Sequence, residues 1–152
     1  MDATTSAPDA PRIALNTPPR GALAARHWAM PAHTNPAGDI FGGWIMAEMD
    51  AAAGMTATRL AGGRIVTAAV SNIVFIKPVK VGDAVCFYTE VKRIGRSSAT
   101  LDVEVWVLRH GCDDRIKVSQ AEFTFVAIGH DGRPRPIVPD AAGNPAGGGA
   151  PG

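Results

Sequence analysis

The chain has 152 residues, of which 46% are hydrophobic and 19% are charged, and its formal net charge is +1. This composition is typical of one globular domain and excludes a chain that is disordered throughout. The 15 Lys and Arg residues against 14 Asp and Glu residues provide no broad basic field, so we expect no nucleic acid among the partners.

The two ends of the chain differ in composition from its middle. Residues 1–21 are rich in Ala, Pro, Thr and Ser, and residues 138–152 are mostly Gly, Ala and Pro, so the first segment is predicted to be disordered and the second flexible. One folded domain is expected over residues 22–137. No stretch approaches the roughly 18 uninterrupted apolar residues of a membrane helix. We therefore predict a soluble cytoplasmic protein without membrane insertion.

The predicted elements begin with a short extended piece at 24–30, in which Trp28 is interpreted as core packing. A loop rich in Pro and Gly follows, and then one uninterrupted helix from Phe41 to Leu60 that ends at Gly62-Gly63. One face of this helix repeats apolar and small residues at helical spacing, namely Ile45, Met49, Ala52, Ala53, Thr56 and Leu60.

Four strand-like runs follow the helix, within 64–79, 85–92, 101–107 and 121–127, and the last three alternate inward and outward residues. Tight turns join most of them, which favours an antiparallel sheet over repeated βαβ units. The sequence therefore predicts an α+β fold, with an antiparallel sheet wrapped around one long central helix.

Metal chemistry has no support in the sequence. Cys86 and Cys112 lack the spacing of metal ligands, and Cys86 falls in a strand-like run where a buried thiol behaves as a small apolar group. The four His residues stand in no HExxH context. We predict no metal site.

The segment with chemical potential runs from Asn35 to Trp44 and places Asp39 just before a helix whose first turn holds Gly42 and Gly43. Glycine disfavours a helix by about 1 kcal/mol relative to alanine, so the pair suggests that a ligand must approach the backbone there. Free amides at a helix start can polarise a carbonyl. With Asp39 as a base beside them, these parts suffice to transfer an acyl group to water.

Each of these residues also has a purely structural interpretation. Asp39 could cap the helix, since Asp is among the preferred N-cap residues. Asn35 could simply form a turn, and Gly42-Gly43 could reflect tight packing of helix on sheet. Chemistry alone does not choose between these interpretations.

The segment MPAHTNPAGDIFGGWIMAEMD resembles the signature of the hotdog-fold cytosolic acyl-CoA thioesterases, including their small single-domain bacterial members. The resemblance continues through GRIVTAAV, FIKPVKVGD, VKRIGRSS, LDVEVWV and AEFTFVAI, nearly all of the span from Met30 to about Pro136. It implies that Asp39 is the catalytic carboxylate, either as general base on water or as a nucleophile that forms an anhydride. Asn35 and the amides of Gly42 and Gly43 would surround the thioester.

The resemblance also implies the substrate and the assembly. Coenzyme A would be part of substrate and product, with no further cofactor, and its binding residues would be Arg64, Lys77, Arg96, Ser97, Ser98 and Arg133, although exposed Arg and Lys are more often solvated charges. A homodimer with shared active sites, or a hexamer built as a trimer of dimers, is expected, because the sheets of such thioesterases join edge to edge.

Two other activities are weighed against acyl-CoA hydrolysis. Some hotdog proteins are enoyl-thioester hydratases or dehydratases, which commonly need a His partner, and the predicted helix contains no His. A non-catalytic acyl-CoA-binding protein would keep the pocket without needing an ionised Asp39. Release of free thiol from acyl-CoA distinguishes hydrolysis from both alternatives, and hydration of an enoyl thioester distinguishes a hydratase from a binding protein.

Overall fold

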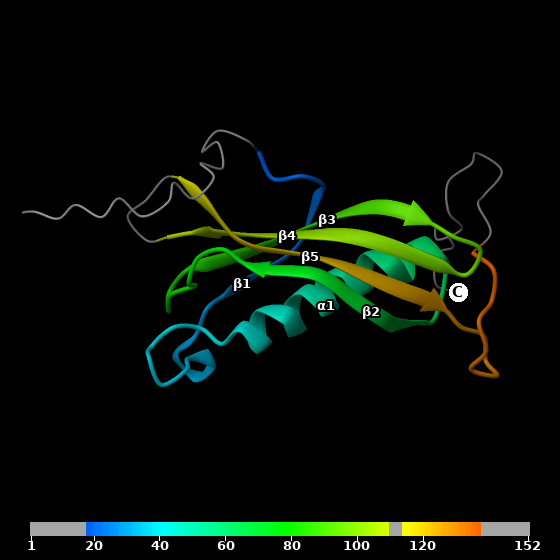
Figure 1. Ribbon diagram of the computed structural model, residues 1–152, viewed down its shortest axis with the longest axis horizontal. Coiled ribbons are helices and arrows are strands. Elements are labelled where there is room, and N and C mark those ends of the chain that lie inside the picture. Colours follow the sequence, from blue (N-terminus) through cyan, green and yellow to red (C-terminus); the bar gives the residue numbers. More distant parts are fainter. Residues whose placement is uncertain (1–17, 110–113, 138–152) are drawn as a thin grey trace, which may run out of the picture.

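The computed structural model describes residues 18–109 and 114–137, and Figure 1 shows one long helix lying along a curved sheet. The elements are β1 (Ala22–Trp28), the short 3-10 helix η1 (Pro31–His33), α1 (Gly42–Ala61), β2 (Ile65–Phe75), β3 (Ala84–Ile94), β4 (Ser98–Leu108) and β5 (Arg115–Ala127). Most of the N-terminal segment 1–21, the C-terminal segment 138–152, His110 and Cys112 lie outside the described residues, so the predictions for them stay predictions.

The strands of this sheet are ordered β1-β3-β4-β5-β2, and each neighbouring pair is antiparallel. Strands β3, β4 and β5 follow one another in sequence and in space. The strands on either side of α1 in the sequence, β1 and β2, take the two edges of the sheet. The predicted antiparallel α+β fold around one central helix is confirmed.

Helix α1 has a buried side made mostly of small residues. It ends at Gly62, whose φ of 69° is the left-handed conformation that glycine adopts without strain. Thr56 and Leu60 are only partly buried, and Ala57 and Ala61 are buried instead. Because alanine adds little bulk, all the strands of the described sheet can approach the helix closely. The fully buried positions are Ile45, Met49, Ala52, Ala53, Ala57 and Ala61.

The bulkiest part of the core comes from the strands that face α1. Phe87, Phe123 and Phe125 are at most 1% exposed and share one cluster with Met49 and Leu101. Complete burial of side chains of this size stabilises the fold by about 1.5–3 kcal/mol each. Their inward direction, predicted from the alternation of the strands, is confirmed.

Part of β3 and β4 is buried on both faces, which the alternation did not predict. Cys86, Tyr88 and Trp106 form a second buried cluster. Beside it Glu104, 4% exposed, accepts hydrogen bonds from Nε1 of Trp106 at 3.3 Å and from Nε of Arg20 at 3.2 Å. The hydrogen bond to Glu104 and its charge raise the pKa of Arg20. A strand face expected to be solvated therefore holds a second layer of packing.

Two further expectations were wrong in detail. Trp28, interpreted as core packing, is 73% exposed at the end of β1. The last strand begins at Arg115 and not near Ala121, because the pairing of β5 with β4 continues back to Leu108 opposite Arg115. Val118 and Ser119, both buried, belong to this added length.

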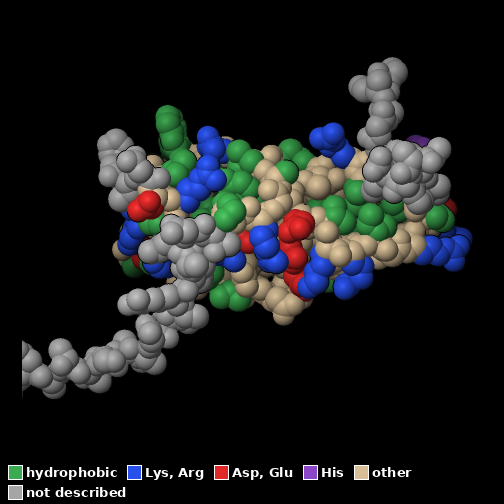
Figure 2. Space-filling model, turned by 90° about the horizontal axis from the view of Figure 1, so that it is seen from above, with side chains coloured by type: hydrophobic (Ala, Val, Ile, Leu, Met, Phe, Trp, Pro, Cys, Tyr) green, Lys and Arg blue, Asp and Glu red, His purple; other side chains and the backbone are tan. Residues whose placement is uncertain are grey.

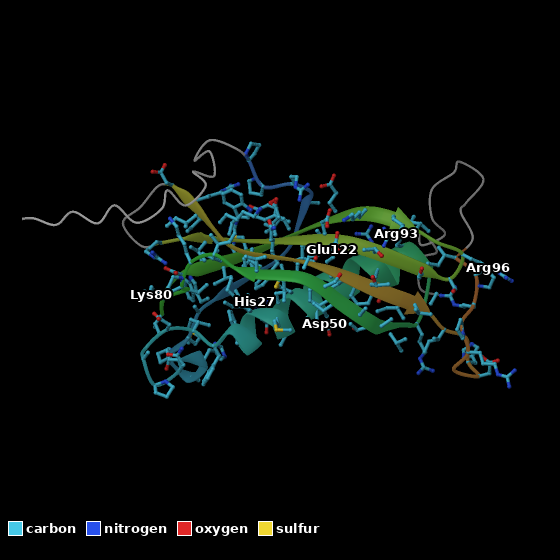
Figure 3. The ribbon with its side chains drawn as sticks, in the orientation of Figure 1. His27, Asp50, Lys80, Arg93, Arg96 and Glu122 are labelled. Carbon is cyan, nitrogen blue, oxygen red and sulfur yellow. The ribbon has the colours of Figure 1, made fainter. Side chains whose placement is uncertain are left out.

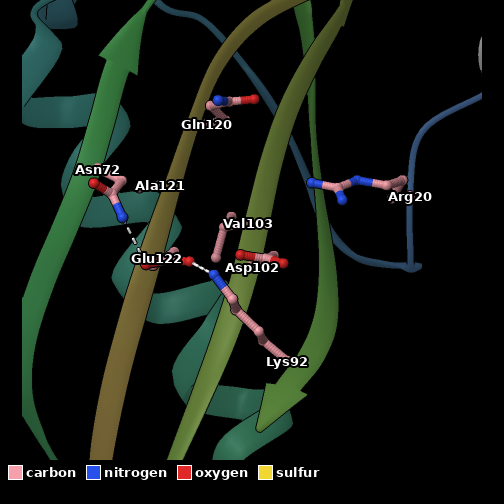
Figure 4. Close-up of a pocket in the computed structure, with 8 residues that line it drawn as sticks. All are labelled: Arg20, Asn72, Lys92, Asp102, Val103, Gln120, Ala121 and Glu122. Atoms are coloured by element: carbon pink, nitrogen blue, oxygen red, sulfur yellow. Dashed lines mark hydrogen bonds and ion pairs between the residues drawn. The ribbon is translucent and has the colours of Figure 1, made fainter.

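The face of the sheet away from α1 carries charges of both signs, which Figure 2 shows side by side near the middle of the surface in view. A pocket of about 270 Å³ lies there (Figure 4), and two of its charges pair with each other: Lys92 forms an ion pair with Glu122, which also accepts a hydrogen bond from Nδ2 of Asn72 at 2.8 Å. The pocket is lined by Arg20, Asn72, Lys92, Asp102, Val103, Gln120, Ala121 and Glu122.

Strand β2 is an edge strand with an unusually exposed apolar surface. Val66, Val70, Val74 and Phe75 are between 38% and 49% exposed. On one side β2 pairs with β5, whereas no strand of the described chain pairs with its other side. A long apolar edge of this kind is a template for pairing with another strand, and natural proteins usually cover it.

Candidate active site

The first two residues of α1 present free backbone donors. Phe41 is the N-cap, and its side chain makes no capping hydrogen bond. The amides of Trp44 and Ile45 donate to the carbonyl of Phe41 at 3.1 and 3.3 Å, whereas no group of the described residues accepts from the amides of Gly42 and Gly43. Such amides carry partial positive charge and can bind a carbonyl oxygen. Asp39 lies two residues before the cap, so its interpretation as the N-cap is wrong.

The two glycines of this turn differ in their surroundings. A Cβ on Gly42 would lie 3.1 Å from Cζ of Phe75, so the small residue there allows the aromatic ring to cover the helix start. A Cβ on Gly43 would meet no described atom within 4 Å. Tight packing within the chain therefore accounts for Gly42 and leaves Gly43 without a packing reason.

Asn35 organises the loop that precedes the helix. Its Oδ1 accepts hydrogen bonds from the amides of Ala37 at 3.0 Å and Asp39 at 3.1 Å, and its own amide donates to the carbonyl of Asp39 at 2.7 Å. This is the turn-forming role expected of Asn. The Nδ2 donors of Asn35 have no acceptor among the described residues, so they remain free for a ligand.

Asp39 forms an ion pair with Lys80, a residue that sequence patterns did not single out. The two lie 41 positions apart and meet because the amide of Ile40 donates to the carbonyl of Val79 at 3.0 Å. Their side chains are 30% and 52% exposed, so solvent screens the pair and its contribution to stability is small. The pair orients the carboxylate of Asp39 toward the turn that follows Val79.

A buried ion pair anchors that turn. Asp83, 2% exposed in its side chain, accepts from Nε and Nη2 of Arg109 at 3.1 and 3.0 Å and also from the amide of Lys80 at 2.9 Å. The backbone of the turn is held in addition by Ala29, whose amide donates to the carbonyl of Asp83 at 3.0 Å. The position of Lys80, and through it Asp39, depends on this anchor.

We expect Arg109→Ala to lower the free energy of unfolding by about 3 kcal/mol, because it leaves the buried Asp83 carboxylate without its charged partner. This is the lower end of the usual range, since the Arg109 side chain is 33% exposed. Urea denaturation measures the change, with the exposed Arg133→Ala as the matched control. A loss no larger than that of the control would contradict the anchoring role.

An apolar pocket of about 380 Å³ opens beside Gly42. Among the described residues, Lys77 is the only charged one that lines it, and Asp39 is not part of this lining. The carboxylate predicted to be catalytic thus lies outside this pocket, while the helix-start glycine forms part of its wall. The lining residues are Ile40, Gly42, Ile45, Phe75, Ile76, Lys77, Pro78 and Val79.

Asp50 is a carboxylate near the middle of α1, on the side of the helix next to β2, and it was not among the predicted site residues (Figure 3). Its Oδ1 accepts a hydrogen bond of 2.7 Å from the hydroxyl of Thr67 on β2. No cationic side chain of the described residues lies within ion-pair distance of it. Asp50 is therefore oriented but not neutralised, as a general base should be.

The predicted coenzyme A residues fall at two ends of the molecule. The amide of Ile128 donates a hydrogen bond of 3.0 Å to the carbonyl of Arg64, and the amide of Ile137 donates one of 2.8 Å to the carbonyl of Arg96. These segments therefore meet at the C-terminal end of α1. Ser97, Ser98 and Arg133 belong to the same end, whereas Lys77 lies at the pocket near Gly42. Figure 3 shows Lys80 and Arg96 at opposite ends. The ends are about 30 Å apart, the length of a 20-residue helix.

The described residues contain neither a cluster of metal ligands nor a membrane-spanning helix. No group of three or more His, Cys, Asp or Glu side chains within them could hold a metal ion. No helix among them is both long and apolar enough to cross a membrane. The expectation that the protein needs no metal and no cofactor stays a prediction.

Comparison with known proteins places the chain in a family. Residues 37–112 match the model of the thioesterase superfamily. A Haemophilus influenzae protein named as an uncharacterized acyl-CoA thioester hydrolase is 48% identical over 121 residues, which are 78% of this chain and 79% of that one. The chain belongs to the thioesterase superfamily. The predictions of a thioesterase and of a hydrolase that acts on thioesters are therefore confirmed.

Solved structures agree with this assignment. A hexameric broad specificity acyl-coenzyme A thioesterase is 45% identical, with a TM-score of 0.77 over 82% of this chain and 86% of that one. A hexameric hotdog fold thioesterase of Campylobacter jejuni is 39% identical, with a TM-score of 0.74 over 78% of this chain and 91% of that one. The hotdog fold predicted from the resemblance is confirmed.

Proposed function

We propose that this thioesterase hydrolyses fatty acyl-CoA to a free fatty acid and coenzyme A. The observation that carries the proposal is the juxtaposition of free amides at the start of α1 with an apolar pocket that shares Gly42 as its wall. A thioester presents a carbonyl for such donors and an acyl chain for such a pocket. The names of the similar proteins add support, since they are acyl-CoA thioester hydrolases and thioesterases.

The proposed site is completed by a second copy of the chain. An edge strand that pairs antiparallel with the same strand of a copy is related to it by a two-fold axis, so the start of one strand faces the end of the other. Phe75, at the end of β2, adjoins Gly42, and Thr67, near its start, bonds Asp50. Pairing through β2 therefore brings the Gly42 and Gly43 amides of one subunit toward Asp50 of the partner subunit.

In this arrangement Asp50 takes the general-base role that the sequence predicted for Asp39. Asp50 removes a proton from water while the water oxygen attacks the thioester carbonyl, whose developing negative charge is held by the amides of Gly42 and Gly43. The carbon–sulfur bond then breaks, and the departing thiolate of coenzyme A takes up the proton that Asp50 holds, which restores the base. Asn35 contributes its free Nδ2 donors near the carbonyl, and Asp39 with Lys80 fixes the loop that carries Asn35.

The same two-fold relation reconciles the two groups of predicted coenzyme A residues. The partner subunit places its Arg64, which directly precedes β2, opposite Phe75 and hence beside Lys77. Phosphates of coenzyme A would then contact the C-terminal end of α1 in the partner subunit, while the thioester reaches Gly42 of the first subunit. The proposed contact residues are Lys77 of one subunit and Arg64, Arg96, Ser97, Ser98 and Arg133 of the other.

A hexamer built as a trimer of dimers extends the proposal, because both solved relatives described above are hexameric. Three dimers need a second contact between copies. Trp28 and Met30, which are 73% and 48% exposed at the end of β1, offer apolar surface on the edge opposite β2.

Light scattering should give six times the chain mass of 15.8 kDa, and a smaller mass for Trp28→Ala. An unchanged hexamer in that variant would exclude this contact. A cytoplasmic location belongs to the same proposal.

Thiol release from acyl-CoA substrates of several lengths tests the function. We expect turnover of saturated acyl-CoA and no hydration of an enoyl thioester, because the imidazole of His33 is already engaged. Its ring stacks on that of Trp44 with the centroids 4.7 Å apart, and its Nδ1 accepts a hydrogen bond from the amide of Met30. Hydration without thiol release would favour a hydratase. Binding without turnover would favour a non-catalytic acyl-CoA-binding protein.

A further inference from the structure

The pocket beside Gly42 has walls suited to a hydrocarbon. Its volume of about 380 Å³ falls within the ~300–1,000 Å³ usual for small-molecule sites. Several backbone groups of its lining residues are already paired: the amide of Ile40 donates to the carbonyl of Val79, and the amide of Ile76 donates to that of Val118 at 2.8 Å, whereas the amide of Gly42 at the entrance has no acceptor among the described residues. A polar group on a bound chain would find few partners there, and an unpaired buried polar group is costly.

The pocket is contiguous with the donors that are proposed to hold the thioester carbonyl. Gly42 contributes both a free amide and a part of the wall, so a carbonyl held by this amide stands at the entrance. Ile45, one helical turn further on, forms the next part of the same wall. An acyl chain attached to that carbonyl has a direct path along these side chains.

Phe75 forms an exposed wall of the pocket. Its side chain is attached to the last residue of an edge strand, is 49% exposed, and lies against the helix start where only glycine leaves it room. The other apolar lining residues from the helix and its preceding loop, Ile40 and Ile45, are at most 5% exposed and fixed in the core. A change in Phe75 therefore alters the pocket without disturbing the packing that holds the fold.

We propose that this pocket receives unsubstituted hydrocarbon acyl chains and that Phe75 sets the longest chain that it accepts. The inference rests on the proposed hydrolysis of fatty acyl-CoA and adds that the chain carries no polar substituent and that one residue limits its length. It assigns Phe75 to specificity and not to the chemical step, so changes at Phe75 should alter the order of preference among substrates.

The wild-type protein tests the substrate class. Each added methylene that enters the pocket should raise kcat/KM by about fourfold, until the pocket is full and the increase stops. Butyryl-CoA should be hydrolysed faster than succinyl-CoA, which has the same number of acyl carbons but ends in a carboxylate. Equal rates for these two substrates, or no dependence on chain length, would overturn the substrate class.

Variants of Phe75 test the chain-length limit. Phe75→Ala should move the end of the increase to longer chains and raise kcat/KM about 16-fold for a chain two carbons beyond the wild-type optimum, at about fourfold for each methylene. Phe75→Trp should move it to shorter chains. Met55→Ala, which truncates a 52% exposed side chain of α1 outside the pocket, is the matched control and should leave the profile unchanged.

The outcomes separate this inference from the proposed function. A wild-type protein that releases no thiol from any acyl-CoA would refute the function itself and the inference with it. Normal thiol release with one shared chain-length profile in wild type, Phe75→Ala and Phe75→Trp would refute the inference alone. An equal loss of rate at every chain length in both Phe75 variants would also refute it, because it would indicate a role in the fold or the chemical step.

Discussion

Asp50→Asn is expected to lower kcat by about 100- to 10,000-fold, the usual contribution of a general base. The amide oxygen of Asn can still accept a hydrogen bond from the hydroxyl of Thr67, so the position of the side chain and the fold should be retained. Thiol release measures the loss, and a melting temperature within a few degrees of wild type shows that the chain is folded.

Asp39→Asn is the matched comparison for this variant. Its amide oxygen can still accept from Lys80, and its side chain does not line the pocket, so we expect a loss of no more than about tenfold. The reverse order, with turnover abolished by Asp39→Asn and nearly retained by Asp50→Asn, would restore the role of Asp39 that the motif predicts and would contradict the site proposed above.

Placing a charge on the exposed edge of β2 is expected to have the second large effect. Val70 lies near the middle of the strand and is 38% exposed, so Val70→Asp places two carboxylates close to each other across a two-fold pairing. Like charges in such contact cost several kcal/mol and should separate the subunits. Because each proposed site needs both subunits, we expect turnover to fall at least 100-fold.

Val91→Asp controls for the charge itself. Val91 has the same exposure of 38% but lies on β3, where it pairs with Leu101 of β4 and is separated from the β2 edge by β4 and β5. We expect this variant to keep its assembly and its activity. Light scattering and thiol release on the same samples measure both effects. A Val70→Asp protein that is monomeric and fully active would show that one chain holds a complete site.

The fold was largely predictable from the sequence because its main signals are local. The Ala-rich periodicity of α1 and the alternation around Phe87 and Phe123 each follow from neighbouring residues. Burial on the second face of β3 was not predictable, because it depends on Trp106, which lies 20 residues away from Cys86 and meets it only through strand pairing.

The site was predictable only in part, because its contacts join distant positions. The glycine pair indicated the free amides at the helix start, and the turn-forming role of Asn35 followed from its neighbours. Asp50 looked like any polar residue on the outer face of a helix, and only its bond to Thr67, 17 positions further on, distinguishes it. A pattern based on a single chain also does not reveal residues supplied by a second copy.

Complementation in mixed assemblies tests the shared site most directly. Gly43→Val should be inactive, because its side chain fills open space where the thioester carbonyl must approach, and Asp50→Asn should be inactive for want of a base. Two copies of the chain co-expressed at equal levels, one with each substitution, would form mixed dimers in which one of the two sites has no substituted residue. Random mixing then predicts recovery of about a quarter of the wild-type activity. Mixed assemblies that stay as inactive as either variant alone would contradict a site shared between subunits.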